Sequence, residues 1–143
     1  MKTISLRYTD KFAPRNGTIA AHKELIKVNG FVWYGKMGAA ISKNVSDMLL
    51  ESSDPKFLLI HSGFIERYWV HFDCISREIP PFEQFPEYYH GIAKNFNTWF
   101  RVTSFENADK NVISKCVVSS SRMPLSEASK HSMSPYFIID YKD

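Results

Sequence analysis

The residues best suited to ligand chemistry stand in the stretch FVWYGKMG, where Trp33 and Tyr34 directly precede Gly35 and Lys36. Large rings offer a stacking surface for a flat ligand, and a glycine lets a ligand approach the main chain closely. A packed core needs the rings without the glycines, whereas a simple turn needs the glycines without the rings. The combination predicts a stacking site with a nucleobase as its ligand.

Two further tryptophans extend this hypothesis. Trp69 and Trp99 each fall in a predicted strand and have an arginine two residues away, Arg67 and Arg101 respectively. Alternation along the strand places Trp69 on its polar face, where a ring either lines a cavity or lies under a covering helix or loop. Two rings one base-thickness apart would hold a planar ligand. Packing of all three tryptophans in the core is the open alternative.

A second group of polar residues follows in IHSGFIERYW. His61 and Ser62 end one predicted strand, and Gly63 forms the turn to the next. Ligand contacts gather at strand ends that surround the mouth of a barrel. Ser62 and nearby main-chain amides can bond a base edge, while Arg67 or Lys36 can meet a phosphate. A plain hairpin with polar ends is the alternative interpretation.

A third candidate is Ser134 in HSMSPYF. Pro135 restricts the preceding residue to extended conformations, so Ser134 leads into a strand. Its hydroxyl would supply one more hydrogen bond to the ligand.

Motifs for catalysis are absent from the sequence. No G-x-S-x-G, H-E-x-x-H, P-loop or G-x-G-x-x-G pattern occurs, and Asp73 and Glu78 form no convincing metal set. We therefore expect neither a metal nor a cofactor, and we favour binding over catalysis. An enzyme acting on nucleotides or RNA, with His61 or His71 as general base, stays open as a second hypothesis.

Composition narrows the partners. The 143 residues carry 18 Lys and Arg against 15 Asp and Glu, a net charge of +3, without the basic stripe typical of duplex-binding domains. Neither a signal peptide nor an apolar run long enough to span a bilayer is present, so we expect a cytoplasmic protein without membrane partners. We expect one domain over residues 1–143. Because the final DYKD, residues 140–143, matches the start of an epitope tag, no function is assigned to it.

The pattern of strands and helices predicts an α+β fold: a small, strongly curved β-barrel of about six strands with two or three flanking helices. Alternation in the strand at 66–76 directs Tyr68, Val70, Phe72 and Cys74 to one face. Strands are expected at 3–8, 31–34, 57–63, 66–76, 98–106, 111–121 and 134–141, helices at 18–30, 41–54 and 124–131, and a proline-rich loop with a short helical turn at 79–97.

Several of these segments together resemble the PUA-like superfamily, especially its EVE, ASCH and YTH branches. The resemblance rests on the helix that carries His22 and on the stretches GFVWYGK, HSG…ERYWVHF, YYHG…TWFRVTSFE and SPYFII, and it covers most of residues 16–139. Such domains are small curved barrels with flanking helices, and many of them read a modified or flipped nucleobase of DNA or RNA in an aromatic-lined pocket.

Carried over by position, the resemblance implies a pocket wall made by the tryptophans and base-edge contacts from Ser62 and the Gly35 main chain. It places Lys36 and Arg67 near phosphate. The modest net charge departs from nucleic-acid readers of this type and leaves room for a free nucleotide as the ligand, bound by a sensor or a sequestering protein. The third hypothesis is a protein–protein inhibitor or adaptor with an exposed aromatic patch at FEQFPEYY, residues 82–89. Exposed rings there favour that hypothesis, and buried rings favour a lid over the pocket.

Overall fold

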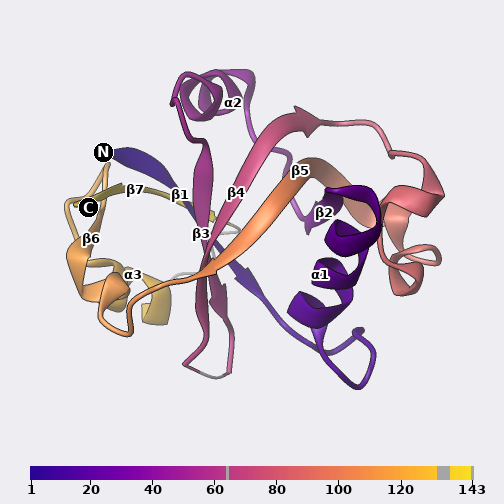
Figure 1. Ribbon diagram of the computed structural model, residues 1–143. Coiled ribbons are helices and arrows are strands. Elements are labelled where there is room, and N and C mark those ends of the chain that lie inside the picture. Colours follow the sequence, from indigo (N-terminus) through magenta and orange to yellow (C-terminus); the bar gives the residue numbers. More distant parts are fainter. Residues whose placement is uncertain (64, 132–135, 143) are drawn as a thin grey trace.

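The computed structural model describes residues 1–63, 65–131 and 136–142, and the elements are labelled in Figure 1. The strands are β1 (Lys2–Tyr8), β2 (Val32–Met37), β3 (Lys56–His61), β4 (Arg67–Ser76), β5 (Phe96–Asn107), β6 (Cys116–Val118) and β7 (Tyr136–Tyr141). The α-helices are α1 (Thr18–Asn29), α2 (Lys43–Leu50) and α3 (Leu125–His131), and 3-10 turns cover Phe82–Gln84, Glu87–Tyr89, Ala93–Asn95 and Val112–Lys115. Within these ranges no helix is long and apolar enough to cross a membrane.

The seven strands of the described chain form one sheet in the order β2-β5-β4-β3-β1-β7-β6. Among the strand pairs of the described residues, β1–β3 alone is parallel and the others are antiparallel. The sheet is strongly twisted, with α1 beside β2 and β5 at one end and α3 beside β6 at the other (Figure 1). The predicted curved α+β fold is confirmed, with the sheet open between its edge strands β2 and β6.

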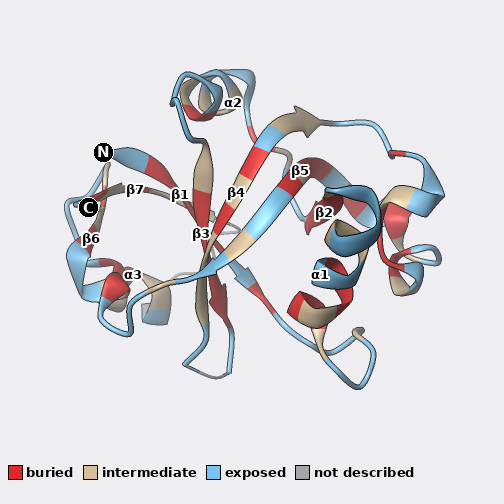
Figure 2. Cartoon of the chain, in the orientation of Figure 1, coloured by how far each residue is buried: buried red, intermediate tan, exposed pale blue. Residues whose placement is uncertain are grey.

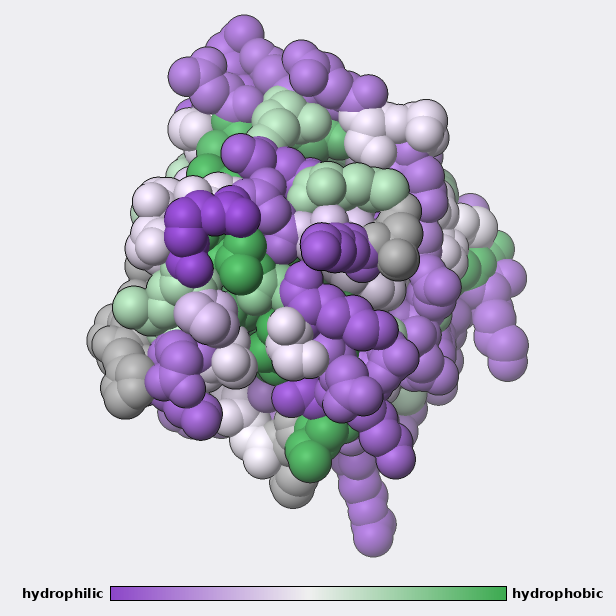
Figure 3. All heavy atoms as spheres, turned by 90° about the vertical axis from the view of Figure 1, so that its left-hand side faces the viewer, coloured by the Kyte–Doolittle hydropathy of each residue, from purple (hydrophilic) through white to green (hydrophobic). Residues whose placement is uncertain are grey.

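Three hydrophobic clusters hold the sheet. The main core packs Ile4, Phe57 and Phe100 among other fully buried side chains, and the α1 residues Ile19 and Leu25 pack into it. A second cluster lies around β6 and α3, and a third lies between β2, β5 and the irregular segment at 82–96. Buried stretches accordingly follow the central strands and one side of α1 in Figure 2. Figure 3, which views the molecule from the left of Figure 1, shows a largely hydrophilic face with only small, separate hydrophobic areas.

Two predicted segments differ from the structure. The alternation along β4 continues through Phe72, but the register shifts on either side of that residue. A bulge places an extra residue in one strand and reverses the facing of the residues after it. Cys74 therefore packs in the third cluster and Ile75 against the main core, the reverse of the prediction. In the predicted strand at 111–121, only Cys116–Val118 is a strand, because a 3-10 turn precedes it.

The chain end that matches the start of an epitope tag belongs to the sheet as far as it is described, as the strand predicted at 134–141 implies. Asp140 and Tyr141 are in β7 and pair with Lys2 of β1 and with Cys116 of β6. The Asp140 carboxylate also accepts hydrogen bonds from Ser119 and Arg122.

Gly35 is the position where the third cluster meets the edge strand β2. A β-carbon built at Gly35 would lie 2.5 Å from Cδ2 of Phe96 and 2.6 Å from its Cγ, far inside van der Waals contact. The Phe96 ring thus occupies the space that any other residue would need. This contact, rather than a turn conformation, explains the glycine, because Gly35 is not among the glycines with positive φ.

We predict that Gly35→Ala lowers the free energy of unfolding by about 1–3 kcal/mol, the usual cost of overpacking a core. Urea unfolding followed by circular dichroism measures the change. The matched control is Gly91→Ala, since nothing lies within 4 Å of a β-carbon at Gly91. That variant should stay within about 0.5 kcal/mol of the wild type. Equal stabilities for the two variants would contradict the assigned contact.

A histidine of the interior strand β4 joins three segments of the chain. His71 Nδ1 lies 3.0 Å from Asp54, which precedes β3, and Nε2 lies 2.8 Å from Glu106 of β5. Burial alone would lower the pKa of His71, but the hydrogen bonds and charges of the two carboxylates outweigh it and raise the pKa above its ordinary value. The protonated ring donates to both carboxylates and so stabilises the fold.

This arrangement predicts a pH-dependent contribution to stability. Because the folded-state pKa of His71 is raised, its contribution is complete below the unfolded pKa of 6.5 and is lost as pH rises through the folded value. His71→Gln should cost about 1 kcal/mol at pH 6, since both carboxylates are exposed, and clearly less at pH 9. Urea unfolding at both pH values tests this. A cost that does not change with pH would refute the assignment, and Glu106→Gln should reduce the same pH-dependent part.

Candidate functional site

A pocket of about 190 Å³ opens between the end of β1, the edge strand β2 and the segment at 88–96. We call it the ring pocket, because six aromatic side chains stand among the described residues that line it. The lining consists of Leu6, Arg7, Tyr8, Thr9, Phe12, Thr18, Tyr34, Gly35, Lys36, Met37, Tyr88, Tyr89, Ile92 and Phe96. A cavity of about 150 Å³ holds a benzene molecule, so this volume suits a ligand with one ring system.

Strand alternation explains which rings reach the pocket. Tyr34 faces the main core and the pocket. Its neighbour Trp33 faces the third cluster, and Gly35, which has no side chain, contributes its main chain to the pocket. Phe96 comes to the pocket because it packs directly on Gly35. Phe12 is 52% exposed and stands on the loop between β1 and α1, and the Lys11 ammonium lies 5.5 Å from the centre of its ring.

One edge of the pocket is a group of neighbouring hydroxyls. The Tyr88 hydroxyl interacts with the side chains of Thr18 and Tyr89, and the Tyr89 hydroxyl also interacts with the Gly35 main chain. Burial raises the pKa of Tyr34, Tyr88 and Tyr89 above the ordinary value of 10. All three hydroxyls are therefore neutral at physiological pH and can donate or accept a hydrogen bond.

Lys36 lines the pocket without offering a free charge. Its Nζ donates to the carbonyls of Met37, at 3.1 Å, and Ala39, at 2.7 Å, and lies 5.1 Å from the centre of the Tyr136 ring. The residue is only 5% exposed, and burial lowers the pKa of its amine. The structure thus gives Lys36 a structural role in the turn after β2, and the exposed cation of the lining is Arg7.

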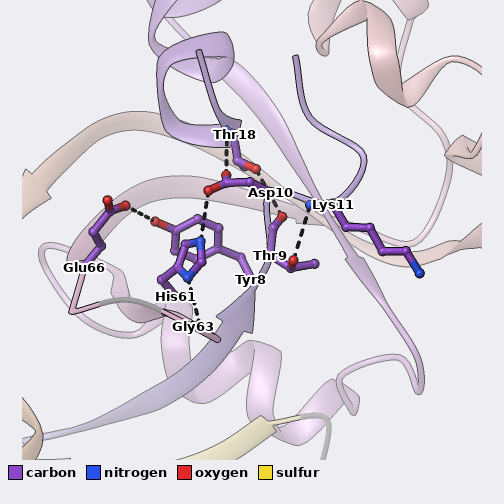
Figure 4. Close-up of polar contacts among 8 residues, drawn as sticks. All are labelled: Tyr8, Thr9, Asp10, Lys11, Thr18, His61, Gly63 and Glu66. Carbon is purple, nitrogen blue, oxygen red and sulfur yellow. Dashed lines mark hydrogen bonds and ion pairs between the residues drawn. The ribbon is translucent and has the colours of Figure 1, made fainter. Parts of the chain in front are cut away.

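His61 packs against Tyr8 in the hydrogen-bonded network of Figure 4. The Gly63 amide donates to Nδ1 at 2.9 Å, so Nε2 carries the proton and donates to Asp10, also at 2.9 Å. With both nitrogens engaged, the neutral ring has no lone pair left for a substrate proton. This geometry weighs against His61 as a general base.

The same network positions Tyr8 and the start of α1. The Tyr8 hydroxyl donates to Glu66 at 3.1 Å, and its ring meets His61 edge-on with centroids 4.9 Å apart. The other oxygen of Asp10 accepts a hydrogen bond from the Thr18 amide at 3.0 Å. Asp10 thus satisfies one of the N–H groups in the first turn of α1, which have no partner within the helix. These contacts hold two residues of the lining, Tyr8 and Thr18, in place (Figure 4).

The three tryptophans lie outside the ring pocket. Trp33 and Trp99 are buried in the third cluster, and the Trp33 indole donates to Gln84 at 3.1 Å. Trp69 packs in the second cluster on the other side of the molecule's core, with its ring 4.9 Å from Tyr141 and the Lys56 ammonium 4.7 Å from its centre. Strand alternation and long-range packing thus distribute the tryptophans over two clusters.

The remaining predicted residues are also dispersed. Ser62 is exposed and its amide donates to the Tyr8 carbonyl at 2.9 Å, which ties the β3–β4 connection to β1. Arg67 is half-buried at the start of β4 and does not line the pocket. Ser134 lies outside the described residues. Of the ten predicted site residues, the structure brings Tyr34, Gly35 and Lys36 together at one pocket.

Sequence reasoning missed most of the lining, above all Tyr8, Phe12, Tyr88, Tyr89 and Phe96. One signal was available: buried rings in the proline-rich segment were expected to form a lid over the pocket, and its half-buried Tyr88 and buried Tyr89 do line the pocket. Phe12 and Tyr8 gave no local signal, since only the folded chain brings the end of β1 and the following loop to the same pocket as β2. Among the described residues no group of three or more His, Cys, Asp or Glu side chains is placed to hold a metal ion.

Comparison with known proteins supports the family. A family model described as Pua-like matches residues 4–142. Searches of curated proteins and of solved structures give no match. PUA-like domains generally bind RNA or nucleobases, and the aromatic clusters described above are consistent with such binding. Since the match spans nearly the whole chain and the curved α+β sheet agrees with it, the protein belongs to the PUA-like family.

Proposed function

We propose that the ring pocket binds a single nucleobase, modified or unmodified, as part of a nucleotide or of a nucleic-acid strand, without turning it over. The observation that carries the proposal is the set of six rings that converge from β1, β2, the loop before α1 and the segment at 88–96 on one pocket. Ring surfaces around a small pocket favour a flat ligand, and stacking contributes about 1–3 kcal/mol per base.

The polar edge of the pocket favours an uncharged ring. Neutral hydroxyls of Tyr34, Tyr88 and Tyr89 are the available partners, and they can match the mixed donors and acceptors of a base edge. The ammonium of Lys36 is already bonded to two carbonyls and does not compete. Arg7 at the lining is the cation that supports a phosphate contact.

Binding is favoured over catalysis because both histidines considered as bases are fully engaged. His61 uses one nitrogen as acceptor and the other as donor, and both nitrogens of His71 contact carboxylates. A sensor of a nucleotide and a protein that sequesters it are both compatible with such a pocket, and turnover assays distinguish either from an enzyme.

We predict that Phe12→Ala weakens ligand binding about 5- to 150-fold, the range that loss of one stacking ring implies. Equilibrium dialysis against a panel of nucleosides, nucleotides and short single strands, methylated bases included, first finds the ligand and then compares variants. The half-exposed ring should leave folding unchanged when removed.

The matched control is Phe82→Ala, since Phe82 is 51% exposed against 52% for Phe12 but lies outside the ring pocket. That variant should bind with wild-type affinity. The proposal fails if no member of the panel binds, or if Phe12→Ala binds as tightly as the wild type.

A further inference from the structure

A second hollow, on the far side of the segment at 82–90 from the ring pocket, lies between that segment and α1. We call it the acidic groove. Its volume is about 490 Å³, within the range of about 300–1,000 Å³ typical of ligand sites. Tyr88 is the one described residue that lines both the groove and the ring pocket.

The lining of the groove is apolar and open to solvent. Val28 is 78% exposed and Phe82 is 51% exposed, and Leu25 lies half-buried beside them. The Phe82 ring is held in place by contacts with Phe85, at 5.2 Å between centroids, and with His90, at 4.9 Å. Held, exposed rings of this kind are typical anchors of protein–protein interfaces.

Three exposed glutamates, Glu24, Glu83 and Glu87, accompany this apolar surface. No lysine or arginine is among the described residues that line the groove, although the whole chain carries a net charge of +3. Within the described chain these carboxylates take part in none of the ion pairs found. Carboxylates repel phosphate, so the groove does not extend the nucleobase site.

We propose that the acidic groove docks a basic segment of a partner protein. An apolar side chain of that segment would pack on Phe82 and Val28, while flanking lysines or arginines would meet Glu83 and Glu87. Charge complementarity supplies specificity and speeds association, and the apolar contact supplies most of the affinity. This inference concerns a second site and does not depend on the nucleobase proposal.

The test uses a displayed library of random twelve-residue peptides, selected on the wild-type protein and counter-selected on Glu83→Lys/Glu87→Lys. We expect the enriched peptides to share an aromatic or aliphatic anchor with neighbouring Lys or Arg. Fluorescence anisotropy of the most enriched peptide should then give at least tenfold weaker binding to the double variant and to Phe82→Ala.

Two controls make the result specific to the groove. Phe12→Ala should bind the peptide normally, as should Glu51→Lys/Glu78→Lys, which reverses two exposed carboxylates elsewhere. The inference is overturned if no peptide is enriched, if the enriched peptides are not basic, or if all variants bind alike. It is also overturned if ultracentrifugation shows that the groove variants abolish a dimer of the protein instead.

Discussion

The contact between Gly35 and the Phe96 ring is the constraint on which the candidate site depends. It lets the irregular segment at 82–96 lie directly on the edge strand β2, where any β-carbon would hold it off. The Tyr89 hydroxyl interacts with the Gly35 main chain at the same place. Because the segment is held there, its tyrosines complete the ring pocket on one side.

The same segment presents two surfaces of opposite chemical character. Toward β1 and β2 it contributes neutral hydroxyls and rings, and toward α1 it contributes glutamates and the exposed Phe82. Lys36, which the sequence pattern placed near a ligand phosphate, is used internally, because its ammonium is bonded to two carbonyls. The pocket is thus suited to an uncharged ring. The exposed charged groups are Arg7 of the pocket lining and the glutamates of the acidic groove.

The sequence was a good guide to local structure and a poor guide to long-range placement. Alternation predicted the strands, and the helix predicted at 18–30 ends at Asn29, before Gly30 with φ 84°. The bulge next to Phe72 was not predictable, because it depends on pairing with β5 rather than on the residues of β4. The stretch at 31–38 did point to the pocket, but through Tyr34 and Gly35 rather than Trp33. Adjacent residues of a strand face opposite ways. Only the packing of β5 and the segment at 82–96 decides which face of β2 borders the pocket and which borders the third cluster.

The central claim is that the ring pocket binds one base. The most direct test is a titration of ¹⁵N-labelled protein with the nucleoside and nucleotide panel, followed by amide chemical shifts in two-dimensional NMR spectra. The account predicts saturable shifts confined to the amides of residues 7–12, 34–37 and 88–96, with those of β6 and α3 unchanged. Saturable shifts centred on Lys56 and Trp69 instead, or no shifts with any ligand of the panel, would contradict it.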